Sequence, residues 1–332
     1  MMLRKVIAIF VFVFCAGLIS SVGFAQDAAA PATPIALPFT LHEVGNGVCA
    51  AIAVPQGKAG SNAGFVIGSD GVAVVDTFVT ADAAKALLAE IRKKTNLPIR
   101  FVVNTHYHLD HTAGNGVFAE AGAVIVAQRN LASWLRTENL KFFGRNPKPE
   151  QKAMVESLAL PQIVYDRGVD LFLGTRRISV RFQPGHTGGD SVVVIPDANV
   201  VFCGDLFWKH TLPNLIDATT SDWIGTLDRM TKAEGAATFI PGHGEIGKAA
   251  DVEQFRDYLA ALRKAVGDAQ ASGKSGDALA EAVLPVMKEK YGDWNFFDHF
   301  SKPNIAQTGA ELKGEKKIPV AGENWFTFDA SN

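Results

Sequence analysis

The sequence predicts an α/β fold in which a β-sheet covered by helices occurs twice. Three observations support this prediction. Short apolar segments separated by Gly, Asn and Asp fill residues 41–76, and strand and helix patterns then alternate as far as residue 136. Four more strand candidates follow one another between residues 168 and 203, and the pattern from about residue 249 onward is helical. The roughly 300 residues that follow an N-terminal export signal are enough for one layered domain.

The first half begins with a meander of short antiparallel strands, which alternating apolar residues and turn-forming breaks predict. Its expected strands are 41–44, 48–54, 63–67 and 72–76. The polar, Gly-rich link at 55–64 is expected to be a solvated turn, with a mobile hairpin over a site as the alternative. Helical spacing predicts a helix over 80–94 that Thr80 caps. The remaining elements of this half are strands at 101–103 and 124–127 and the start of a helix at 130–136.

The second half repeats the order of strands followed by helices. Residues 140–161 are expected to form an irregular loop that either covers a pocket with Phe142 and Phe143 or packs on the body of the domain. Four strands are expected at 168–173, 178–182, 191–195 and 200–203. The helical tail from about residue 249 carries an aromatic group at Trp294, Phe296, Phe297 and Phe300. We expect this group to dock on the body, to cover a pocket mouth or to form a dimer surface, and the oligomeric state stays open.

Residues 1–25 have the pattern of an export signal: a basic start, an apolar run over 6–19 and a small-residue cleavage site that ends at Ala25. The apolar run is short for a membrane span, so we expect cleavage and no stable membrane insertion afterwards; an uncleaved anchor is the alternative. The Ala- and Pro-rich residues 26–38 are expected to be a disordered leader, and 39–332 the folded domain. The predicted location is periplasmic or secreted.

The composition bears on partners and on cysteine chemistry. The formal charge is −2 and no basic patch or charge run occurs, which argues against nucleic acid as a partner. Cys49 and Cys203 remain after signal cleavage, and the sequence leaves open whether they pair. Cys203 is expected to be a buried apolar residue, although its place two residues before Asp205 would also suit a soft metal ligand.

Residues 101–116 contain a dense group of metal-binding side chains. An apolar strand leads into four such residues, which are His106, His108, Asp110 and His111. His106 and His108 lie two apart, so an extended chain points both the same way, and the other two follow where the chain turns. Four imidazole and carboxylate donors in six residues predict a transition-metal site, with zinc first and iron or manganese behind it. Three later residues, His186, Asp205 and His243, each lie at an expected strand end or in a Gly-rich turn, and each alone is a weak signal.

The spacing His-x-His-x-Asp-His at 106–111 resembles the signature of the metallo-β-lactamase superfamily. The resemblance implies an αββα four-layer sandwich with extra C-terminal helices, and a site for two Zn²⁺ ions. By the same resemblance, the first ion would be bound by His106, His108 and His186, and the second by Asp110, His111 and His243. Asp205 would bridge the two ions.

The resemblance further implies a hydrolase that acts on a small-molecule substrate. A metal-bridged hydroxide would attack an ester, thioester, lactone or amide-like carbonyl, β-lactams included, and Asp110 would orient it or relay its proton. Asn214 and Lys209 resemble β-lactamase residues that hold the substrate carbonyl and carboxylate. Asp205, however, stands where the β-lactamases most similar in this half have Cys, and it resembles the glyoxalase II, lactonase and wider hydrolase branches. Similar exported chains also resemble the hydrolases of quinoprotein relay systems.

Other branches of the superfamily use the same motif differently. A mononuclear iron dioxygenase acting on sulfur species keeps much of it, and is the alternative function; the complete second-metal set with His111 and His243 favours hydrolysis. The flavo-diiron oxidoreductases have Glu in place of His108. Asp76 matches a common superfamily aspartate, which is expected to brace a loop or a ligand. The histidines without ligand-like spacing are His42, expected at the surface, and His210 and His299, expected at a pocket rim.

Overall fold

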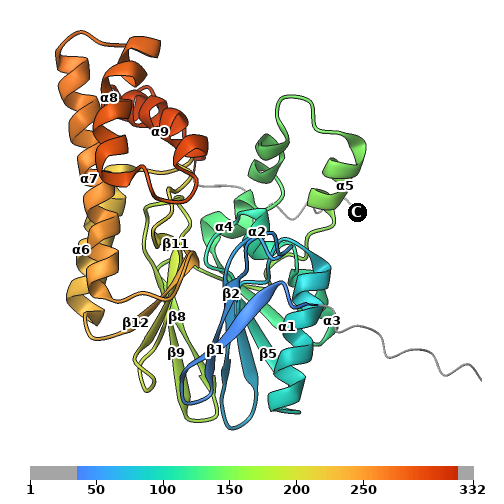
Figure 1. The fold of residues 1–332 in the computed structure, drawn as a ribbon. Helices are drawn as coiled ribbons and strands as arrows, with labels where there is room; N and C mark the ends of the chain where they lie inside the picture. The colour runs from blue at the N-terminus through green and yellow to red at the C-terminus, as the bar shows by residue number, and fades with distance from the viewer. Residues whose placement is uncertain (1–35, 321–332) are drawn as a thin grey trace, which may run out of the picture. The chain divides into compact units, whose positions relative to one another are not determined.

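The computed structural model describes residues 36–320, in which two β-sheets lie face to face with helices on their outer sides (Figure 1). The expected signal at 1–25, most of the expected leader and residues 321–332 lie outside the described residues. Within 36–320, no helix combines the length and the apolar character needed to cross a membrane.

The first sheet has seven strands in the order β1-β2-β3-β4-β5-β6-β7. These are β1 (Phe39–Gly45), β2 (Val48–Ala53), β3 (Ala63–Ile67), β4 (Val72–Val75), β5 (Ile99–Val103), β6 (Val124–Gln128) and β7 (Ile163–Tyr165). Neighbours from β1 to β4 are antiparallel, which confirms the predicted meander, and neighbours from β4 to β7 are parallel. The short strand β7 was not predicted; it lies between the loop expected at 140–161, which in the structure contains η1 and α5, and the strand expected at 168–173.

The second sheet has five strands in the order β12-β11-β10-β9-β8. These are β8 (Gly168–Leu173), β9 (Arg176–Phe182), β10 (Ser191–Ile195), β11 (Val200–Trp208) and β12 (Thr238–His243). The four strands predicted between 168 and 203 are confirmed, but β11 continues five residues past its expected end to Trp208. Only β11 and β12 pair in parallel among the described strands of this sheet, so both of their C-terminal ends reach the same edge.

Helices cover both outer faces, so the layers follow the αββα order that the resemblance implied (Figure 1). On the first sheet lie α1 (Ala81–Lys94) and α3 (Asn115–Glu120), and near them α2 (Leu109–Thr112), α4 (Arg129–Trp134), η1 (Glu138–Phe143) and α5 (Pro149–Glu156). On the second sheet lie α6 (Thr220–Glu234) and α7 (Ala249–Ala271), followed by α8 (Gly276–Tyr291) and α9 (Phe297–Leu312). Thr80 caps α1 as predicted, since its side chain accepts a hydrogen bond from Ala83 N.

Four apolar cores occur in the described residues, and three of them join the sheets and the outer helices. Strand β2 shows how one segment contributes to two of these three. Val48, Ala50 and Ile52 face the core between the sheets, whereas Cys49 and Ala51 face the core under α1 and α3. The third core lies between the second sheet and helices α6 to α9. A strand buried on both faces needs apolar residues at every position, which explains the continuous apolar run at 48–54.

The cores answer the open question of cysteine pairing and test the expected burial of Cys203. Cys49 and Cys203 are both buried and unpaired. They belong to the outer cores of opposite sheets, so the whole inter-sheet layer lies between the two sulfur atoms. Burial raises the pKa of the Cys203 thiol and keeps it protonated. Cys203 is therefore the buried apolar residue that was expected and does not face the cluster of histidines.

The expectation of a solvated turn at 55–64 is wrong for the second half of that link. Ser61 and Asn62 are buried, and Asn62 donates hydrogen bonds to the carbonyls of Pro241 (2.9 Å) and Gly244 (2.8 Å) on either side of His243. Ser61 Oγ donates to the carbonyl of Asp110 over 2.6 Å. The link therefore joins the end of the second sheet to the turn that follows β5.

Candidate metal centre

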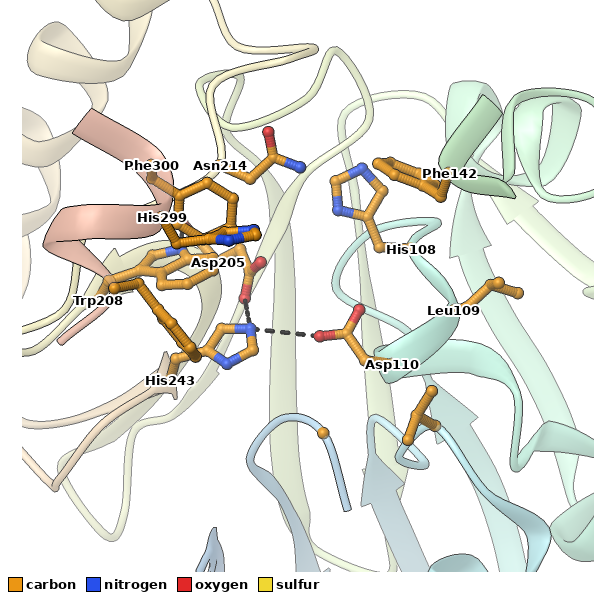
Figure 2. A pocket seen from close by; sticks show the side chains of 13 residues that line it. His108, Leu109, Asp110, Phe142, Asp205, Trp208, Asn214, His243, His299 and Phe300 are labelled. Atoms are coloured by element: carbon orange, nitrogen blue, oxygen red, sulfur yellow. Dashed lines mark hydrogen bonds and ion pairs between the residues drawn. The ribbon is translucent and has the colours of Figure 1, made fainter. Parts of the chain in front are cut away.

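The seven predicted ligands come from five segments that end at the same edge of the sandwich. His106 and His108 follow β5, Asp110 and His111 lie in the short helix α2, and His186 lies in the turn between β9 and β10. Asp205 lies within β11 rather than at its end, and His243 is the last residue of β12. Figure 2 shows Asp205 and His243 facing Asp110 across a cavity.

Two glycines allow these segments to approach one another. Gly204 has a φ of +50°, and a Cβ there would lie 2.3 Å from Thr105 Oγ1. A Cβ at Gly242 would lie 1.9 Å from Asp205 Oδ1. Any larger residue at either position would therefore displace the chain beside His106 or the carboxylate of Asp205.

One group of donors consists of His106, His108, His186 and Asp205, all of them buried. Asp205 Oδ2 lies 3.2 Å from His186 Nε2 and 3.5 Å from His106 Nε2. His108 turns its Nδ1 inward, 3.1 Å from His186 Nε2. Three imidazole nitrogens and one carboxylate oxygen thus surround a single point.

The second group consists of Asp110, His111 and His243. Asp110 Oδ2 lies 3.3 Å from His243 Nε2 and 3.6 Å from His111 Nε2. The other oxygen of Asp205, Oδ1, lies 3.1 Å from His111 Nε2 and 3.4 Å from His243 Nε2. Asp205 therefore presents one oxygen to each group.

The cluster fits metal ions because its buried donors converge without satisfying one another. Within the described residues, four buried atoms that face the cluster have no hydrogen-bond partner: His106 Nε2, His111 Nε2, Asp205 Oδ1 and His243 Nε2. An unpartnered buried polar atom costs about 1–3 kcal/mol, so such a set is costly unless a cation binds there. Imidazole nitrogen together with carboxylate oxygen is the donor set that zinc and other divalent transition metals use in proteins.

A family model described as the metallo-beta-lactamase superfamily matches residues 57–243, which is more than half of the chain. The chain belongs to the metallo-beta-lactamase superfamily. The site described above is therefore a metal-binding His/Asp site typical of this superfamily. The matched region ends at His243, so it includes all seven predicted ligands and leaves out helices α7 to α9.

Relatives within the superfamily carry different activities. The chain is 24% identical over 272 residues to a linear primary-alkylsulfatase of Pseudomonas sp., a match that covers 67% of this chain and 51% of the relative. It is 26% identical over 166 residues to the hydroxyacylglutathione hydrolase of Brucella anthropi, covering 50% of this chain and 55% of the relative. The chain thus spans about half the length of the curated relatives it matches.

Solved structures of the superfamily share the fold. A metallo-beta-lactamase from Pontibacter korlensis superposes with a TM-score of 0.56 at 21% identity, covering 67% of this chain and 99% of that one. The stereoselective inverting sec-alkylsulfatase from Pseudomonas sp. gives a TM-score of 0.67 at 17% identity, covering 83% of this chain and 50% of that one. The larger coverage in the second comparison shows that more of this chain's fold has a counterpart there.

Burial and neighbouring charges set different protonation states in the two donor groups of this superfamily member. Burial and the neighbouring His111 lower the pKa of His106 well below its usual value, so its ring is neutral and keeps a lone pair. Burial also acts to lower the pKa of His243, but the carboxylates of Asp205 and Asp110 outweigh it and raise that pKa to about 9. For Asp110, burial raises the pKa, but the histidines His111 and His243 outweigh it and bring it to about 2. Asp110 is therefore ionised at neutral pH.

Two aspartates outside the ligand set contact the ring nitrogens of His111 and His108 that point away from the donor cluster. Asp76 Oδ2 lies 2.8 Å from His111 Nδ1, which agrees with the bracing position expected for Asp76. Asp217 was missed by the sequence analysis, and its Oδ2 lies 3.4 Å from His108 Nε2. The one sequence signal for Asp217 is that it is the only acid in the largely apolar stretch 212–218.

A cavity of about 480 Å³ opens onto the metal centre (Figure 2). Its polar lining comes from the ligands, His299 and Asn214, and its remaining walls are apolar, with Phe142, Trp208, Phe296 and Phe300 among them. Asn214, predicted to hold a substrate carbonyl, does line this cavity, and its Oδ1 also accepts a hydrogen bond from Ile216 N over 2.9 Å. Its role in binding substrate stays a prediction.

Lys209, the predicted carboxylate anchor, lies away from this cavity. Its Nζ donates to the carbonyl of Ile246 over 2.9 Å and lies 3.3 Å from Asp251 Oδ1. Lys209 instead lines a second cavity of about 610 Å³, which it shares with His210 and the outer side of His243. Its binding of a substrate carboxylate stays a prediction that would require the ammonium to leave both partners.

Proposed function

We propose that the chain is a dinuclear zinc hydrolase that cleaves a carbonyl ester, thioester, lactone or amide-like bond. One observation carries the proposal: Asp205 directs Oδ2 to the group of His106 and His186 and Oδ1 to the group of His111 and His243. A carboxylate placed in this way suits two ions at once, whereas a site for a single iron would leave the second group without a role. The complete second group therefore favours hydrolysis over the iron dioxygenase.

Two bound zinc ions would supply an activated water molecule and polarise the substrate carbonyl. The side chains of this protein then have separate tasks. Asp110 lines the cavity as an ionised carboxylate, so it can accept the proton of the attacking water and pass it to the leaving group. Trp208 stacks on His243 with the ring centroids 3.9 Å apart, which fixes the orientation of that imidazole.

The walls of the cavity favour an uncharged substrate with an apolar acyl group. Among the described residues that line the cavity, none is Lys or Arg. Val79, Phe142 and Phe296 belong to the lining and are 37%, 39% and 53% exposed, so apolar surface continues to the mouth. Burying one methylene group against such a surface contributes about 0.8 kcal/mol. A substrate that carries a carboxylate would find no fixed cation there beyond the metal ions.

Hydrolysis of an alkyl sulfate ester is the second candidate. One relative is a linear primary-alkylsulfatase, and the same apolar walls suit an alkyl chain. The two candidates differ in where the charge of the substrate lies, since a sulfate ester brings an anion to the metal ions and a carboxylic ester does not.

The test is a panel of substrates with zinc-loaded protein. We expect p-nitrophenyl octanoate to be cleaved with a kcat/KM at least about tenfold above that for p-nitrophenyl acetate, and above those for nitrocefin and a glutathione thioester. Dodecyl sulfate tests the second candidate. Metal content should be two zinc ions per chain; one iron per chain with oxygen consumption, or no cleavage of any carbonyl substrate, would overturn the proposed function.

We also propose that the protein is exported, on the basis of the pattern in residues 1–25. The mature domain would then begin near Gln26 and lie in the periplasm or outside the cell. Mass spectrometry of the protein expressed in a Gram-negative host checks this proposal: a mature N-terminus at Gln26 is expected, and an intact N-terminus in the cytoplasmic fraction would contradict it.

A further inference from the structure

The two ring nitrogens of His108 face different partners. Its Nδ1 points into the donor cluster, 3.1 Å from His186 Nε2. Its Nε2 points the other way, 3.4 Å from Asp217 Oδ2. A ring with two such contacts binds a metal through Nδ1 only if the proton stays on Nε2, so the partner of Nε2 decides which nitrogen is available.

Asp217 is positioned to determine which ring nitrogen of His108 carries the proton. Only 4% of its surface is exposed, and it lies in the loop between β11 and α6, far from His108 in sequence. Its Oδ2 also accepts a hydrogen bond from the hydroxyl of Tyr107, and its Oδ1 accepts one from Lys141 Nζ over 2.6 Å. An ionised carboxylate can only accept hydrogen bonds, so the hydrogen between His108 and Asp217 belongs to the imidazole.

The ion pair between Asp217 and Lys141 connects this contact to residues 138–143, the roof segment, in which Phe142 lines the cavity. Lys141 and Phe142 are neighbours in η1, and the Phe142 ring meets the His108 ring edge-on, with centroids 4.9 Å apart. Asn139, in the same short helix, donates to the carbonyl of Tyr107 over 2.7 Å. The roof segment 138–143 is therefore attached to the ligand turn through Asn139 and Phe142, and to Asp217 through Lys141.

We propose that Asp217 is a positioning residue that, held by Lys141, fixes the ring of His108 with Nδ1 toward the metal centre and the roof segment over it. This inference rests on the proposed function only in taking His108 as a ligand. Asp217 is not among the seven ligands, and in the described structure it lies behind His108 rather than in the cavity lining.

The experiment measures zinc affinity by competition with a chromophoric chelator, so it does not depend on knowing the substrate. We expect Asp217→Asn to weaken the binding of one of the two zinc ions by about 10- to 100-fold, as loss of a carboxylate behind a histidine ligand does. Asp217→Glu should recover part of the loss. The matched control is Asp222→Asn, an exposed acid in the first turn of α6, which should bind both ions like the wild type.

Two further variants identify the affected zinc ion and test the hydrogen bond between Lys141 and Asp217. His108→Ala identifies the affected ion, because it should weaken the same binding step as Asp217→Asn. Lys141→Met leaves the carboxylate in place and removes one of its hydrogen bonds, so a smaller loss of about fivefold is expected, and this variant replaces Asp217→Asn if the latter does not fold. The visible spectrum of the cobalt-substituted protein should change in the same variants.

Unchanged affinity for both ions in folded Asp217→Asn, or in Lys141→Met if it is the variant used, would overturn the positioning role. Failure of the proposed function looks different: the wild type would bind two zinc ions, respond to Asp217→Asn as described, and cleave no carbonyl substrate. The chelator titration and the substrate panel therefore report on the two proposals separately.

Discussion

Asp76 Oδ2 lies 2.8 Å from Nδ1 of His111, on the side of the ring opposite the donor cluster. The other oxygen of Asp76 accepts a hydrogen bond from Thr105 N over 2.8 Å, so the same carboxylate holds the chain just before His106. Asp76 is 2% exposed and has a φ of +57°. One buried side chain thus orients ligands of both donor groups.

Asp76→Asn should weaken zinc binding by about 10- to 100-fold, because the amide removes the negative charge behind His111. Asn adopts positive φ readily, so the backbone at this position should tolerate the change. Chelator competition measures the affinity, and thermal unfolding of the metal-free protein checks the fold. Asp70→Asn, an exposed acid close in sequence, is the matched control, and equal zinc affinities in the two variants would exclude the bracing role.

Asp205→Asn tests whether one carboxylate serves both ions. An amide is uncharged and offers a single oxygen, so both groups would lose the shared negative charge and one of them would also lose its oxygen ligand. We expect the zinc content, measured by plasma emission spectrometry after gel filtration, to fall from about two ions per chain to about one. Turnover should fall by about 1000-fold or more, since the carbonyl and the nucleophile lose one of their two stabilising cations. Retention of two tightly bound zinc ions would show that Asp205 does not bridge.

The gathering of the seven candidate ligands could be predicted from the sequence because each of them belongs to a local pattern. His106, His108, Asp110 and His111 follow one apolar strand, and His186, Asp205 and His243 each lie beside Gly at or near a strand end. The ends of neighbouring strands meet at one edge of the folded sandwich, so residues in these local patterns come together in one site. The repeated order of strands followed by helices was visible in the sequence pattern, whereas the αββα layering was implied by the resemblance to the superfamily.

Contacts made by loops could not be predicted in this way. Asp217 and Tyr107 carry no spacing relation to each other, and only the packing of two separate loops brings them together. The aromatic group in the tail shows the same limit. Trp294 and Phe297 are buried in the core of the C-terminal helices, while Phe296, which has a φ of +61°, is exposed and turns toward the cavity. The positive φ at Phe296 therefore directs this side chain to the cavity, whereas Trp294 and Phe297 on either side of it pack into the core.

The apolar wall predicts a dependence on acyl chain length that one side chain should control. Phe300 lies on α9, lines the cavity beside Phe296 and His299, and is not one of the seven predicted ligands. Phe300→Ala should lower kcat/KM for p-nitrophenyl octanoate by about tenfold, through loss of roughly 1–2 kcal/mol of apolar contact, and leave the acetate within about twofold. Phe172→Ala, at an exposed position on β8, is the control. An equal loss for both esters would show that Phe300 does not contact the acyl chain.

Lys316 gives the fold a pH dependence whose sign follows from its surroundings. Its ammonium donates to the carbonyls of Leu215 (2.6 Å) and Ala218 (2.5 Å), in the loop that carries Asp217. Burial lowers the pKa of Lys316 to about 8 from its ordinary value of 10.5, and Glu311 and Asp217 oppose the shift only in part. Between about pH 8 and 10.5 the unfolded chain therefore binds more protons at this residue than the folded one does. Stability should rise with pH across that window, because the folded state loses its buried charge first.

Lys316→Met removes this titration and keeps most of the buried volume. The free energy of unfolding of the wild type, measured in urea relative to that of the variant, should increase by on the order of 2 kcal/mol between about pH 8 and 10. The tyrosines and cysteines are common to both proteins, so their titrations cancel in the difference. Lys317→Met, at an exposed neighbouring position, should show a constant difference from the wild type over the same range. A difference for Lys316→Met that stays level or falls as the pH rises would mean that burial does not govern this lysine.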